Sequence, residues 1–276
     1  MFDTSGLNAL LDDPDSNALV DGIKTGYRVR LCGSSVDEVF ATSDPARRNA
    51  LLDLCCKLLA AGDCTWPFYW IVERQVASFA RGREFDWKNL NVKSAGYQEL
   101  ISRRETITEE LVERQKVALF EAKKQLATLL DSERPAIEVF FAGGAKRPQD
   151  FHQFLGMAQD SFWNFARAEY RYNRGGGQAP DDEALRRFVK ACPPFQAMVL
   201  ASMMFLYGRC VREENVPGSH RADRLDVLMA IYLPYCDVFV TNDPKQGTCL
   251  REIASEADID ALVLAYERFR TSLVAL

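Results

Sequence analysis

The segment 232–243 constrains the fold more than any other part of the chain. It reads Tyr-Leu-Pro-Tyr-Cys-Asp-Val-Phe-Val-Thr-Asn-Asp. Its β-branched and aromatic residues at 237–241 predict a short strand, and Pro244 marks the first turn of a following helix. An apolar run at 261–265 predicts another strand, with a final helix over 266–273. Strands that alternate with helices predict a parallel sheet covered on both faces.

The first 80 residues show the same alternation. Met1–Asp3 is a minimal strand, and Tyr-Arg-Val-Arg-Leu-Cys at 27–32 predicts a second one. A capping box of Ser35 and Glu38 predicts a helix over 34–41. Two more helices are predicted, one from Pro45 to a stop at Gly62 and one over 68–79.

The middle of the chain has a different character. A capping box of Thr106 and Glu109 predicts a long amphipathic helix, and another helix is predicted over 149–172. No strand-rich pattern occurs between them. We therefore expect a three-layer α/β/α fold with a short central parallel sheet, built from residues 1–82 and 190–276 and interrupted by a helical insertion at 83–189.

Composition excludes several classes of protein. No window approaches 18 uninterrupted apolar residues, so no membrane span is expected, and acids interrupt the N-terminal apolar residues, so a cytoplasmic protein is expected. The eight cysteines form no CxxC pair and there are only two histidines, which excludes a zinc pattern. The net charge of −5 means that any contact with nucleic acid requires a local basic patch.

Four acids are expected at one edge of the sheet. Asp3 and Asp243 each follow a predicted strand, and Glu38 and Asp226 each lie in the opening turn of a predicted helix. In a parallel sheet these positions share one edge. Such carboxylates repel one another unless a cation compensates them, and Mg²⁺ or Mn²⁺ suits hard oxygen ligands. Taken singly, each acid also has a structural interpretation as a helix cap, a capping-box partner, a turn former or a first-turn charge.

The order of these motifs resembles the PIN-domain nucleases. The resemblance rests on Asp-Thr-Ser at 3–5, Ser-x-x-x-Glu at 34–38 and Val-Thr-Asn-Asp at 240–243, and it covers about residues 1–80 and 195–276. It implies a site for Mg²⁺ or Mn²⁺ formed by Asp3, Glu38, Asp226 and Asp243. Asp223 is a candidate auxiliary ligand or water-positioning base. Thr4, Ser5 and Thr241 are expected to support the acids by hydrogen bonds.

The middle block carries one candidate nucleic-acid surface. Arg167, Arg171 and Arg174 share one face of the helix predicted over 149–172, and aromatic residues lie between them. Arginines and aromatic rings together suit single-stranded nucleic acid. A solvated surface helix explains the same pattern.

The resemblance implies a metal-dependent nuclease, such as a toxin or defence effector, with RNA rather than DNA as the expected substrate. An inhibitory partner protein and a homo-oligomer both remain open. The alternative is a catalytically silent PIN-like module that serves as a binding or assembly scaffold. A phosphatase of the haloacid dehalogenase type fits less well, because it needs a second Asp where Ser5 stands.

Overall fold

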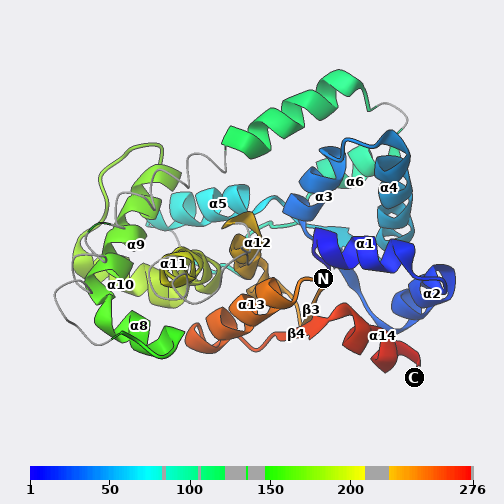
Figure 1. Ribbon diagram of the computed structural model, residues 1–276. Coiled ribbons are helices and arrows are strands. Elements are labelled where there is room, and N and C mark those ends of the chain that lie inside the picture. Colours follow the sequence, from blue (N-terminus) through cyan, green and yellow to red (C-terminus); the bar gives the residue numbers. More distant parts are fainter. Residues whose placement is uncertain (83–84, 105–106, 122–134, 136–146, 209–223, 275–276) are drawn as a thin grey trace.

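The computed structural model of the 276-residue chain describes residues 1–82, 85–104, 107–121, 135, 147–208 and 224–274. The fold is mixed α/β, with many helices around a few short parallel strands (Figure 1). The N-terminus lies in the middle of the molecule beside β3 (Val238–Thr241) and β4 (Leu262–Ala265).

The strands form two parallel pairs that the N-terminal residues connect. β1 (Val29–Leu31) pairs with β2 (Gly62–Cys64), and β3 pairs with β4. Phe2 makes parallel bridges to both Leu31 of β1 and Val240 of β3. The order across the fold is therefore β2, β1, Phe2, β3, β4. The first segment of the chain adds β1 and β2 on one side of Phe2, and the last segment adds β3 and β4 on the other side. The strand order therefore reverses at Phe2.

The two outer segments contain the helices predicted over 34–41, from Pro45, over 68–79 and over 266–273, together with further helices. The first segment contains α1 (Thr4–Asp12), α2 (Ser16–Gly26), α3 (Gly33–Phe40), α4 (Pro45–Leu59) and α5 (Phe68–Ala80). The last contains α11 (Pro193–Tyr207), α12 (Arg224–Leu228), the 3-10 helix η4 (Met229–Tyr235), α13 (Pro244–Glu256) and α14 (Tyr266–Val274). The strands predicted at 27–32, 237–241 and 261–265 are confirmed. The predicted helix whose opening turn contains Asp226 is instead α12 followed by η4, which contains Pro234.

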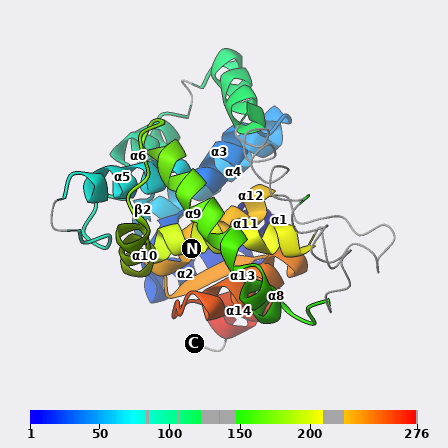
Figure 2. The same cartoon turned by 90° about the vertical axis from the view of Figure 1, so that its left-hand side faces the viewer.

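The middle block contains α6 (Ala95–Ser102), a helical segment at 109–121, α8 (Phe151–Met157), α9 (Gln159–Asn173) and α10 (Asp182–Ala191). The one helix predicted over 149–172 is two helices with a break at Ala158. The segment 109–121 lies at the outer edge of the molecule in both views (Figure 2).

Side chains of the strands alternate between two hydrophobic clusters. Val29, Leu31, Val240 and Leu264 belong to one cluster, together with buried residues of α1, α2 and α4. Phe239 and Val263 belong to the other, together with buried residues of α5, α11 and η4. This alternation is expected when helices pack against both sides of a strand.

The middle block shares both clusters with the outer segments. Ile101 of α6 lies in the first cluster, and Phe165 of α9 and Phe188 of α10 lie in the second. Lys93 makes an antiparallel bridge to Thr65 at the end of β2, although no strand pairing was predicted in this block. These contacts connect the middle block closely to the rest of the fold.

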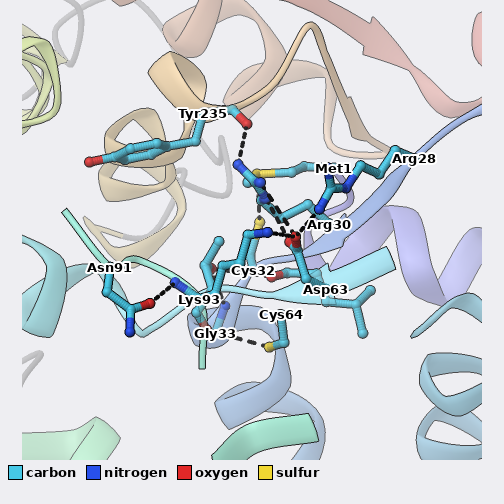
Figure 3. A network of polar contacts seen from close by, with 12 residues as sticks. Met1, Arg28, Arg30, Cys32, Gly33, Asp63, Cys64, Asn91, Lys93 and Tyr235 are labelled. Carbon is cyan, nitrogen blue, oxygen red and sulfur yellow. Dashed lines mark hydrogen bonds and ion pairs between the residues drawn. The ribbon is translucent and has the colours of Figure 1, made fainter. Parts of the chain in front are cut away.

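A charged cluster fixes the β1–β2 pair. The carboxylate of Asp63 on β2 is almost fully buried and faces Arg28, Arg30 of β1 and Lys93 (Figure 3). The shortest of these contacts joins Arg30 Nε to Asp63 Oδ1 at 2.7 Å, and Arg30 also donates to the carbonyl of Tyr235 in η4 at 3.0 Å. The cluster therefore links β1, β2, residue 93 and η4.

Candidate functional site

Asp3 lies directly after Phe2, at the point where the strand order reverses. It is the N-cap of α1, and its Oδ1 accepts a hydrogen bond from Gly6 N at 2.7 Å. Ser5 Oγ lies 2.9 Å from Oδ2, and Thr241 Oγ1 of β3 donates to the same oxygen at 2.7 Å. The side chain of Asp3 is 3% exposed. Residues from the two ends of the chain thus hold one buried carboxyl group.

Burial raises the pKa of Asp3 from its ordinary value of 3.8 to about 6. The hydrogen bonds from Gly6, Thr241 and Ser5 oppose this rise, and the negative charge of Asp243 adds to it. Thr241 Oγ1 contacts both Asp3 Oδ2 and the backbone N–H of Asp243, so the two predicted site acids share a neighbour.

Asp243 is the N-cap of α13. Its Oδ1 accepts from the backbone N–H groups of Lys245 at 2.7 Å and Gln246 at 3.0 Å, as a capping role predicts. Its own N–H donates to Thr241 Oγ1 at 3.1 Å. Asn242 N donates to Ser5 Oγ at 2.8 Å. The loop after β3 is therefore bonded to the first turn of α1.

Glu38 is held differently from the prediction. The capping box of Ser35 and Glu38 is wrong, because α3 begins at Gly33, where a Cβ would lie 2.6 Å from the carbonyl oxygen of Thr65. The N-cap of α3 is therefore Cys32, three residues before Ser35. The half-buried Glu38 instead accepts a hydrogen bond from Thr4 Oγ1. Thr4, which follows Asp3 in the chain, thus connects Glu38 to the first residue of α1.

Asp226 lies in the first turn of α12, as predicted, and is half-buried. Its backbone carbonyl accepts from Gln246 Nε2 at 2.9 Å, and Gln246 Oε1 lies 2.6 Å from Thr241 Oγ1. The backbone of Asp226 therefore joins the same network. Asp223 lies outside the described residues.

Gln246 is a site residue that the sequence analysis missed. It is 2% exposed and connects α12, α13 and β3 through its side-chain amide. The spacing of Asp243 and Gln246 is that of a capping box, and this signal could have identified it. A second missed residue is the acid Asp37, whose Oδ1 accepts from Tyr97 OH at 2.5 Å and whose pKa burial raises to about 7.

A divalent cation needs several oxygen donors around one point. Among the described residues, no group of three or more His, Cys, Asp or Glu side chains is arranged to hold a metal ion. Mg²⁺, however, is commonly bound by one or two carboxylates and keeps several waters. The interacting pair of Asp3 and Asp243 fits this mode, because all of its donors are hard oxygens.

The predicted arginine face is partly engaged in local contacts. Arg167 donates to Asp182 at 2.8 Å, and Arg174 donates to the carbonyl of Gln178 at 2.7 Å. Arg171 is exposed in the last turn of α9. The contact with Asp182 reduces the positive charge that this face presents.

No single helix among the described residues is long and apolar enough to cross a membrane. Helices α10 and α11 together have the length and composition of a membrane-spanning segment, but the chain bends by 102° between them. In comparisons with protein-family models, curated proteins and solved structures, the chain gives no match.

Proposed function

We propose that the chain is a metal-dependent nuclease with a three-layer, PIN-like α/β/α fold. One observation carries the proposal: Asp3, Glu38 and Asp243 come from three separate segments and gather around the point where the strand order reverses at Phe2. In open parallel α/β sheets, ligands bind in the crevice outside the carboxyl ends of the strands at this reversal. The two hydrophobic clusters that share the strand residues support the three-layer arrangement.

Each site residue has a role that its contacts support. Asp3 and Asp243 would hold Mg²⁺ or Mn²⁺, and such an ion supplies an activated water and stabilises the leaving oxygen of a phosphodiester. Ser5 and Thr241 orient the Asp3 carboxylate, and Thr4 orients Glu38. Glu38 and Asp226 would act through water, since no three acids converge on one point among the described residues.

RNA is the substrate that the resemblance to PIN-domain nucleases favours, with cytoplasmic RNA as the proposed target. Arg171 and its neighbours on α9 would contact phosphates of a bound strand. A toxin or defence effector of this type would have an inhibitory partner protein, and a homo-oligomer is compatible with the same site.

The alternative is a silent PIN-like module, and a specific observation favours it. Asp3 caps α1, Asp243 caps α13, and Glu38 bonds to Thr4, so each has a structural partner without any metal. In such a module these acids would only stabilise helix ends.

The substitution Asp243→Asn separates the two functions. Asn caps helices about as well as Asp, so α13 keeps its cap while the site loses one charge. Purified variant and parent would be assayed with labelled single-stranded RNA and DNA in Mn²⁺ and Mg²⁺. Cleavage by the parent and its loss in the variant are expected. Asp181→Asn is the matched control, because Asp181 caps α10 in the same way and lies outside the site.

Metal titration provides an independent test. Mn²⁺ that binds only the folded state raises the melting temperature, and the rise should grow with concentration in the parent and in Asp181→Asn. It should be absent in Asp243→Asn. A parent protein that neither gains stability with Mn²⁺ nor cleaves RNA or DNA would instead support the silent module.

A further inference from the structure

A cavity of about 650 Å³ lies beside Glu38, between the core and the middle block. Its walls come from α3, α5, the helical segment 109–121 and α9, with Leu228 at the end of α12. Its volume is typical of cavities that bind small molecules. Glu38 itself belongs to the lining, so the cavity borders the acids at the sheet edge.

The lining has one sign of charge. Five carboxylates line the cavity, and no Lys, Arg or His belongs to the described lining. The five are Asp37, Glu38, Glu73, Glu121 and Glu169. Carboxylates without basic neighbours attract cations and repel phosphates.

Two of these acids are buried and incompletely hydrogen-bonded. Glu169 is 6% exposed, and its carboxylate has one long contact, from Asn173 Nδ2 to Oε2 at 3.4 Å. Asp37 likewise has one short contact, from Tyr97 OH to Oδ1 at 2.5 Å. Burial raises the pKa of Glu169 to about 7. Buried carboxylates of this kind are stabilised when a cationic donor binds beside them.

The remaining wall is apolar and aromatic. Phe68, Tyr69 and Tyr172 contribute rings, and Leu119 and Met198 contribute aliphatic surface. Aromatic faces attract ammonium groups, and aliphatic surface suits a methylene chain. A ligand that matches this wall therefore combines positive charge with apolar segments.

The positions of the acids indicate whether the ligand is a single ion or a longer molecule with several separated charges. No three of the acidic groups in the described residues converge on a metal-binding arrangement. The charges are instead spread over four helical elements around the cavity. We propose that this cavity binds a linear aliphatic polyamine, with ammonium groups at the separated carboxylates and methylene chains against the apolar wall. This proposal does not depend on nuclease activity.

The test is calorimetric titration of the full chain with spermidine, in low salt with EDTA and no divalent cation. Spermidine should bind the parent, whereas butylamine, which carries one charge, should bind much more weakly. Glu169→Gln should weaken spermidine binding by about tenfold or more, because it removes a charged hydrogen-bond acceptor. Glu73→Gln should also weaken binding, and its exposed position makes it safe for folding.

Two control variants carry substitutions outside the cavity, one on α10 and one at the sheet edge. Glu183→Gln makes the same chemical change at an exposed residue of α10 that does not line the cavity, and it should leave spermidine binding unchanged. Asp243→Asn should also leave it unchanged, whether or not it abolishes nuclease activity. The proposal is overturned if the parent does not bind spermidine, if neither cavity variant weakens binding, or if an oligolysine peptide binds tightly and spermidine does not.

Discussion

Replacement of Asp3 by Asn should stabilise the protein at neutral pH. The buried carboxyl has a pKa of about 6 in place of the ordinary 3.8, chiefly because burial disfavours its charged form. One unit of pKa corresponds to about 1.4 kcal/mol, so ionised Asp3 costs the folded state roughly 3 kcal/mol. Asn has the same shape, can keep its oxygen on Gly6 N, and can donate to the hydroxyl groups of Ser5 and Thr241.

The stability difference between Asp3→Asn and the parent should depend on pH in a defined direction. Well below its ordinary pKa of 3.8, Asp3 is protonated in both the folded and the unfolded state, so its contribution to stability is fully present. As the pH rises through about 6, the unfolded state has already released the proton and the folded state resists doing so. The contribution is lost over this window. The Asn side chain of the variant cannot ionise, so the advantage of Asp3→Asn over the parent should grow from a small value at pH 4 to roughly 3 kcal/mol above pH 7.

Urea unfolding followed by circular dichroism at pH 4, 5.5 and 7.5 measures the difference in unfolding free energy between Asp3→Asn and the parent. Subtraction of the parent removes the common titration of other buried acids such as Asp37 and Glu169. Asp181→Asn, an N-cap change at an exposed residue, should show no comparable trend. A difference that does not change with pH would refute the reasoning.

Three further predictions concern other parts of the fold. Gly62→Ala should destabilise the protein by about 3 kcal/mol in urea unfolding, because the new Cβ would lie 1.7 Å from the carbonyl oxygen of Val29. Gly22→Ala in α2 meets no atom within 4 Å and should instead stabilise by roughly 0.5–1 kcal/mol, so equal effects of the two changes would contradict this account. Asp63→Asn should lower stability by about 2 kcal/mol, because it leaves three basic side chains without their buried counter-ion; an unchanged melting temperature would contradict it. Replacement of three arginines by Gln, Arg167 and Arg171 in α9 and Arg174 at its C-cap, should weaken nucleic-acid binding and flatten its dependence on salt without changing Mn²⁺ affinity. Identical binding at every salt concentration would mean that this face of α9 has another role.

The parts of the fold that the sequence predicted are those with strong local signals. Residues 238–241 and 262–265 are rich in branched apolar side chains, and Pro244 marks the start of the helix between them. β2 was missed because Gly-Asp-Cys has no strand-like pattern. Its position follows from the close approach of Gly62 to Val29 and from the ion pairs of Asp63, and both are tertiary contacts.

The candidate site also has some features that the sequence predicts and others that depend on tertiary contacts. The placement of Asp3 and Asp243 could be predicted, because topology alone brings the ends of parallel strands to one edge. The partner of Glu38 could not, since the packing of Gly33 against residues 65–67 decides where α3 begins. The acid-lined cavity was equally beyond prediction. Its five carboxylates come from four helical elements that are distant in sequence, and only tertiary packing brings them together.

Asp3 offers a physical argument between the two proposed functions. A silent module needs only a cap for α1, and Asn at this position would supply one without any buried charge. The ionised Asp costs the folded state about 3 kcal/mol at neutral pH, so the scaffold function gives no reason for a carboxyl group here. A site that binds a divalent cation does give a reason, because the cation requires the charge that burial penalises. Asp243 is half-buried and could serve as a cap alone, so the distinction rests on Asp3.

If Asp3→Asn gains stability at neutral pH and loses Mn²⁺ binding, the same carboxyl both weakens the fold and binds the metal. If it gains stability and the parent binds no Mn²⁺, the acid at position 3 has no function in metal binding and the silent module is favoured.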